Sequence, residues 1–152
     1  MEDTLISFET AKLAKEKGFN IGCKNKYVET LEHALEMGRG GDCTFPHIPT
    51  RVLTNSSYEK WDIVHCDAPT QSLLQRWLRE VHNIYVESYH DLTSDGTKIQ
   101  FYTSWGFLQQ KDKNGNRNVN GWYDEYNDWK TYEEALEIGL QEGLKLLSDE
   151  FY

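Results

Sequence analysis

The segment that begins at Thr131 constrains the fold more than any other part of the sequence. Thr131 and Glu134 form the Thr-x-x-Glu pattern of a capping box, which predicts a helix over residues 131–147. Small residues recur every four positions along this helix, at Ala135, Gly139 and Gly143. Each mid-helix glycine costs roughly 1 kcal/mol relative to alanine. We therefore predict that the helix lies very close to a sheet or another helix.

The residues before this helix alternate between apolar and polar, as half-buried strands do. Ile84 and Val86 alternate with Tyr85 and Glu87 in a strand over residues 84–90. A second strand is predicted over residues 98–108, with Asp95-Gly96 in the connecting turn. A third strand is predicted at about 118–126.

A broad apolar face predicts a helix over residues 68–82, with Trp77 in the core. Asp67 is the expected N-cap, because Pro69 is tolerated in a first turn, where the N–H groups are unpaired. The residues of the apolar face are Leu73, Leu74, Trp77, Leu78 and Val81.

The N-terminal part is less regular. A helix is predicted from the N-cap Ser7 to about Lys17, ending at Gly18. Apolar residues spaced three and four apart predict a second helix over residues 27–37, and residues 50–54 read as a short strand. We expect one domain over residues 1–152, with residues 20–66 the hardest to interpret. Its class is α+β: an antiparallel sheet of about three strands, in the order α-β-β-(β)-α after an N-terminal helix, with helices 68–82 and 131–147 on one face.

Composition excludes several classes of function. The chain has 152 residues, with 16 Lys and Arg against 25 Asp and Glu, a net charge of −9. Such a charge opposes binding to the phosphates of nucleic acids. No apolar run approaches the roughly 18 residues of a membrane span, and the N-terminus lacks the pattern of a signal peptide. We expect a cytoplasmic protein without a membrane partner, and no cofactor.

An acidic, aromatic segment is the main candidate for a binding site. Tyr and Trp side chains with acidic neighbours are typical of surfaces that bind proteins. This interpretation predicts a protein partner, and the acidic C-terminal half would steer a basic one. The alternative is that Trp122 and Trp129 pack beneath the last helix while the tyrosines shield the edge of the sheet. The candidate residues are Trp122, Tyr123, Asp124, Glu125, Tyr126, Asp128 and Trp129.

Two other kinds of site are weaker candidates. A nucleic-acid site would use the cations of two predicted helices, Lys12, Lys15, Lys17, Arg76 and Arg79. A zinc site would draw on thiolate and imidazole ligands from Cys23, Cys43, His47, His65 and Cys66. No Cys-x-x-Cys pair is present, so we expect no metal. No nucleophile, base and oxyanion donor can be assembled into a catalytic set.

Three segments resemble a family of small proteins of gut bacteria and of their phages and mobile elements. The segments are SFETAKLAKEKGF at 7–19, APTQSLLQRWLRE at 68–80 and TYEEALEIGLQEGL at 131–144. The resemblance implies an accessory protein of phage or mobile-element origin and brings no defined activity. The order of helix, strands and helix is also similar to double-stranded-RNA-binding domains, and the last junction to HicB-like antitoxins. Glu133 and Glu134 stand where the RNA-binding fold requires cations.

Overall fold

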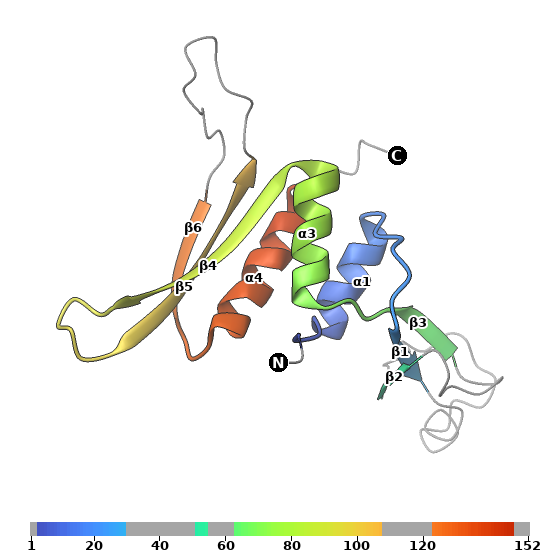
Figure 1. The fold of residues 1–152 in the computed structure, drawn as a ribbon, viewed down its shortest axis with the longest axis horizontal. Coiled ribbons are helices and arrows are strands. Elements are labelled where there is room, and N and C mark those ends of the chain that lie inside the picture. The colour runs from blue at the N-terminus through green and yellow to red at the C-terminus, as the bar shows by residue number, and fades with distance from the viewer. Residues whose placement is uncertain (1–2, 30–50, 55–62, 108–122, 148–152) are drawn as a thin grey trace, which may run out of the picture. The chain divides into compact units, whose positions relative to one another are not determined.

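The computed structural model describes residues 3–29, 51–54, 63–107 and 123–147 (Figure 1). The chain divides into two compact units. Unit 1 comprises Met1–Thr4 and Thr70–Tyr152, and unit 2 comprises Leu5–Pro69. Each unit contains a three-stranded antiparallel sheet. The predicted α+β class is therefore confirmed, and the single domain over residues 1–152 stays a prediction.

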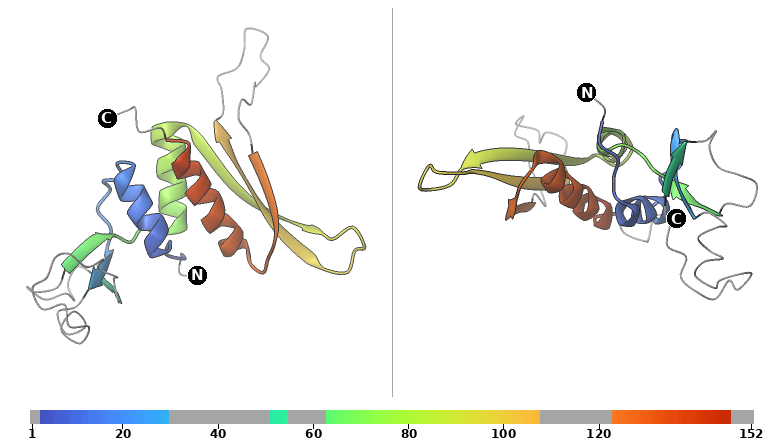
Figure 2. Two further views of the ribbon diagram at one scale, coloured as in Figure 1. Left: turned by 180° about the vertical axis from the view of Figure 1, so that it is seen from behind. Right: turned by 90° about the horizontal axis from the view of Figure 1, so that it is seen from below.

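Unit 1 is a sheet with helices on one face. Its elements are α3 (Gln71–His82), β4 (Ile84–Leu92), β5 (Ile99–Phe107), β6 (Tyr123–Trp129) and α4 (Tyr132–Lys145). The strand order is β4-β5-β6. Helix α4 packs against β4 and β5, and α3 lies beside α4 and against β4 (Figures 1 and 2). The predicted hairpin and both predicted helices are present.

Two side-chain amides tie α3 to its neighbours. The Nε2 atom of Gln71 donates to the Glu133 carbonyl oxygen at 2.9 Å and to the Glu137 carboxylate at 3.1 Å. One helical turn later, Gln75 Nε2 donates to the Val86 carbonyl oxygen at 2.6 Å. This last bond satisfies a backbone acceptor of β4, which is an edge strand of the sheet.

Helix α4 has the N-cap and the close contact with the sheet that the sequence predicts. Thr131 accepts a hydrogen bond from the Glu134 N–H at 3.1 Å, and the Glu134 carboxylate accepts one from the Lys130 N–H at 2.8 Å. A Cβ atom added to Gly139 would lie 2.1 Å from Thr103 Oγ1 and 2.7 Å from Val86 Cγ1. The helix therefore touches the sheet at a distance that only glycine allows, and the predicted close approach is confirmed.

The start and the apolar face of α3 differ from prediction. Its N-cap is Thr70, whose hydroxyl accepts from the Leu73 N–H at 3.3 Å. Asp67 instead ends a strand of unit 2 and forms an ion pair with Lys26 at 2.6 Å. On the apolar face, Trp77 is buried as predicted, whereas Val81 is 62% exposed.

The third strand of the sheet continues further than predicted. It reaches Trp129 instead of ending near residue 126, and residues 118–122 lie outside the described part of the chain. Tyr102 pairs with Tyr126, but Phe101 pairs with Trp129. The two extra residues in β6 form an irregularity, which keeps the chain extended while it changes register.

The described elements of unit 2 are α1 (Phe8–Glu16), β1 (Asn25–Glu29), β2 (Arg51–Thr54) and β3 (Ile63–Asp67), with the strand order β2-β1-β3. Ser7 caps α1 as predicted, and Gly18 adopts a φ of 88° after its end. The strand predicted at residues 50–54 is confirmed as β2.

The helix predicted over residues 27–37 is wrong for residues 27–29, which belong to β1; residues 30–37 lie outside the described part. Val28 and Glu29 are buried in this central strand. Pairing with strands on both sides overrides the helical spacing of the sequence, because strand preference depends on tertiary context. In the described residues, no helix is both long and apolar enough to cross a membrane.

Candidate functional site

The face of the β4-β5-β6 sheet opposite α4 is the main candidate for a site. Successive side chains of a strand point to opposite faces, and Val86 and Thr103 meet α4 on the other side. We call the opposite surface the tyrosine face. Its residues are Tyr85, Glu87, Tyr89, Asp91, Tyr102 and Asp124.

Contacts between side chains confirm that these residues share one face. The rings of Tyr89 and Tyr102 lie 5.2 Å apart at their centroids, with 31° between their planes. The Tyr89 hydroxyl donates to the Glu87 carboxylate. Burial, the bond to Glu87 and the negative charges of Glu87 and Asp124 raise the pKa of Tyr89. Tyr89 therefore stays a neutral phenol in an acidic surrounding.

The tyrosine face has one sign of charge. Glu87, Asp91 and Asp124 are exposed, whereas the three tyrosines are half-buried. No described lysine or arginine occupies a ladder position on this face. Of the helices that the structure describes in unit 1, both pack from the other side or along β4, and neither covers the tyrosine face (Figure 2).

Strand β6 divides the predicted protein-binding segment between the two faces. Asp124 lies on the tyrosine face, whereas Tyr123 pairs with Trp105 on the α4 side and stacks on its ring, with centroids 6.1 Å apart. Glu125 pairs with Thr103 on that same side, whereas Trp129 follows the irregularity in β6 and pairs with Phe101. Trp122 lies outside the described residues, and the side chains of Tyr126 and Asp128 are not described. The described side chains of the segment thus do not form one continuous surface.

The cations proposed for nucleic-acid binding are divided between the units. Lys12 and Lys15 lie on α1 of unit 2, and Lys17 is its C-cap, whereas Arg76 and Arg79 lie on α3 of unit 1. Two have partners within their own unit: Lys15 donates to the His65 carbonyl oxygen at 2.7 Å, and Arg76 pairs with Glu80 at 3.1 Å. Neither unit places all five on one of its surfaces.

The described residues of the proposed zinc site offer poor ligands. Burial raises the pKa of both Cys23 and Cys66 to about 11, so that their thiols stay protonated at neutral pH. His65 faces the buried Glu29 carboxylate at 3.7 Å. Cys43 and His47 lie outside the described part, and within that part no three His, Cys, Asp or Glu residues are grouped as metal ligands would be.

The sequence contained a signal for the tyrosine face. The alternation in residues 84–90 already separates Tyr85, Glu87 and Tyr89 from Ile84 and Val86. A dense run of aromatic residues in the sequence does not indicate them, because one face of a sheet is formed by alternate residues of several strands. The pairing of the strands, which brings Tyr102 and Asp124 beside them, had to come from the structure.

Comparison with known proteins gives no match to a protein-family model, to a curated protein or to a solved structure.

Proposed function

We propose that the chain is a non-catalytic protein-interaction module that binds a basic partner on the tyrosine face. The observation that carries this proposal is a sheet face with three tyrosines, three carboxylates and no cation at its described ladder positions. Tyrosine supplies contact area at little cost in conformational entropy and is enriched in energetically important interface positions. The proposal retains a phage or mobile-element origin, on the basis of the three resembling segments.

Charge determines the kind of partner. The three carboxylates lie within one sheet face, so their potentials add and attract a segment rich in lysine or arginine. Such steering acts mainly on the rate of association, whereas the rings determine how slowly the complex separates. We therefore expect the three carboxylates to determine the association rate and the pair Tyr89–Tyr102 to determine the dissociation rate.

The experiment uses full-length protein to capture partners from a bacterial lysate and then measures the kinetics of a purified partner. The variant carries Glu87→Lys and Asp124→Lys. The matched control carries Asp3→Lys and Glu16→Lys, at two exposed positions that are not part of the tyrosine face, and so has the same net charge. We expect the first variant to slow association at least tenfold at low salt and the control to bind like wild type.

A second variant tests the rings. Tyr102→Ser should accelerate dissociation while leaving the association rate nearly unchanged, because an interface anchor acts mainly on the off-rate. Equal losses in the charge variant and its control would contradict the proposal. If the captured material is lost on nuclease treatment, the chain binds nucleic acid and the proposal of a protein partner is wrong.

A further inference from the structure

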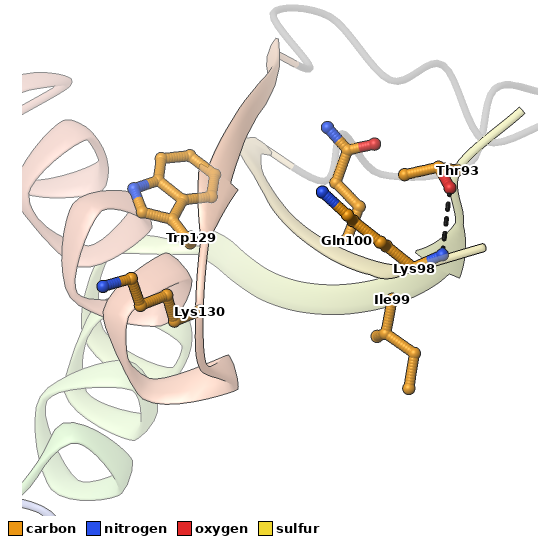
Figure 3. Close-up of a pocket in the computed structure, with 6 residues that line it drawn as sticks. All are labelled: Thr93, Lys98, Ile99, Gln100, Trp129 and Lys130. Carbon is orange, nitrogen blue, oxygen red and sulfur yellow. Dashed lines mark hydrogen bonds between the residues drawn. The ribbon is translucent and has the colours of Figure 1, made fainter.

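A pocket of about 410 Å³ opens where the β4–β5 turn meets the end of β6 (Figure 3). This volume falls within the usual range of small-molecule sites, roughly 300–1,000 Å³. Its walls come from three short stretches of unit 1 that the hairpin brings together. The lining residues are Thr93, Lys98, Ile99, Gln100, Trp129 and Lys130.

The side chains that line the pocket fall into two groups. Figure 3 shows the Trp129 indole on one side, with Lys98 and Gln100 extending toward it from the other. Trp129 takes this place because the two extra residues of β6 bring it opposite Phe101. Thr93 accepts a hydrogen bond from the Lys98 N–H at 3.2 Å, which fixes the backbone from which the Lys98 side chain starts.

The charge of the pocket is opposite to that of its surroundings. Residues 67–152 carry 15 acidic and 8 basic side chains, yet the described residues that line the pocket include two lysines and no carboxylate. Both lysines are exposed, and among the described residues neither ammonium group forms an ion pair. A cationic pocket in an acidic unit selects an anion locally and repels long polyanions through the wider field.

We propose that this pocket binds a small anion attached to a flat ring, such as a nucleoside monophosphate or an aromatic carboxylate. The ring stacks on the Trp129 indole, an interaction that suits any flat π-system. Lys98 binds the anionic group as a point charge, and the Gln100 amide donates to it or to a ring atom. Lys130, whose ammonium lies on the far side of the Trp129 indole from Lys98 in Figure 3, adds positive charge to the field around the pocket. The site adjoins the end of the tyrosine face, because Gln100 pairs with Asp91, but it does not depend on the function proposed for that face.

The test follows the Trp129 indole N–H signal by NMR, assigned through its loss in Trp129→Phe. The probes are adenosine monophosphate, benzoate, inorganic phosphate and adenosine. We expect saturable shifts with the first two, and much weaker ones with phosphate, which lacks the ring, and with adenosine, which lacks the charge. The tighter of the first two probes identifies the source of the anion.

Substitutions then separate charge from stacking. Lys98→Gln with Lys130→Gln should weaken adenosine monophosphate binding at least tenfold, since hydrogen bonds to charged groups contribute more than that factor. Lys24→Gln with Lys145→Gln carries the same change in charge at positions that do not line the pocket and should leave binding unchanged. Trp129→Leu, followed through signals of the ligand, should reduce the affinity for the monophosphate to that for phosphate.

Three results would overturn the proposal. They are no saturable shift with any probe, equal affinity for phosphate and adenosine monophosphate in wild type, and undiminished binding in the Lys98→Gln and Lys130→Gln variant. The tyrosine-face variants used for partner binding should leave the shifts intact, so failure of one site is distinguishable from failure of the other.

Discussion

The described parts of units 1 and 2 each combine a three-stranded antiparallel sheet with helix, two helices in unit 1 and one in unit 2, but the interactions between sheet and helix differ. In unit 1, apolar side chains such as Leu78, Ile84 and Leu140 are fully buried. Gly139 and Gly143, which we call the glycine row, allow α4 to lie in close contact with the sheet.

Among the described residues, unit 2 buries fewer large apolar side chains, namely Ile6, Phe19 and Val28, and polar contacts between residues far apart in sequence also join its segments. This difference explains why the helices and strands of unit 1 can be predicted from its sequence. Apolar packing requires a periodic pattern of apolar residues, whereas a single polar contact has no such pattern.

Three hydrogen bonds illustrate the polar contacts of unit 2. Tyr27 Oη donates to the Ile6 carbonyl oxygen at 2.5 Å, and Lys15 Nζ donates to the His65 carbonyl oxygen at 2.7 Å. The Cys23 N–H donates to Asp67 Oδ1 at 3.1 Å. Each bond joins segments at least 21 residues apart. Such bonds each contribute roughly 1 kcal/mol, so unit 2 depends on several of them acting together.

The largest expected effect is at the core of unit 1. Trp77 is only 4% exposed, and Trp77→Ala should lower the free energy of unfolding by about 3–5 kcal/mol, through lost contacts and the cavity left behind. Denaturant titration measures the loss, and a change below about 1 kcal/mol would show that α3 does not face the core.

The same variant tests whether the two units form one domain. With a single domain, Trp77→Ala should increase amide hydrogen exchange in the strands of both units by the same factor, because both would exchange through one global unfolding. Unchanged protection in β1 and β3 would instead show that unit 2 unfolds independently.

The next largest effect is expected from the glycine row. Gly139→Ala should destabilise the protein by about 1–3 kcal/mol, because the new methyl group would overlap Thr103 and Val86. In an open helix the same change would stabilise by roughly 1 kcal/mol, so the sign of the effect is decisive. Gly22→Ala in unit 2, where nothing lies within 4 Å of the new Cβ, is the control and should be nearly neutral.

A smaller effect is expected from a polar contact of unit 2. Tyr27→Phe keeps the ring that packs against Phe8, with centroids 5.3 Å apart, and removes the hydroxyl that binds Ile6. The loss should be about 0.5–1.5 kcal/mol in urea unfolding. Tyr85→Phe is the matched control in unit 1, where the hydroxyl makes no hydrogen bond to a described residue. An equal change in both variants would contradict the importance of polar contacts in unit 2.

The smallest effect concerns the pH dependence of unit 1. The His82 ring packs against Trp77 with centroids 4.4 Å apart, and burial lowers the pKa of His82. The unfolded chain then binds a proton more readily than the folded one, so this contribution to stability is present above about pH 6.5 and is lost as the pH falls. Between pH 7.5 and 5.5, wild type should lose more stability than His82→Gln. Parallel pH profiles would disprove this role.

Particular residues show what could be predicted from the sequence. The capping box at Thr131 and the alternation around Val86 are local patterns, and both gave correct elements. The spacing of Val28 suggested a helix, because a central strand buried on both faces also lacks simple alternation. Asp67 resembled an N-cap, but its ion pair with Lys26, 41 residues away, has no local signature.

The candidate site was only partly predictable for a related reason. The sequence predicted an acidic, aromatic surface in the C-terminal half, but that prediction followed one strand of the sheet. The pairing of Ser104 with both Glu87 and Asp124 is what brings these carboxylates onto one face. The pocket beside Trp129 depends on the irregularity in β6, and no repeating pattern of residues predicts where a strand gains two residues.

The contact between α4 and the sheet also restricts how this protein can evolve. Gly139 meets Thr103 and Val86 side chains at distances that exclude any Cβ atom, and Gly143 meets Val86 in the same way. A descendant with alanine at position 139 would need a smaller residue at 103 or 86 in compensation. Substitutions at these three positions should therefore be coupled among any relatives that share the fold, whereas surface residues of the same strands remain free to diverge.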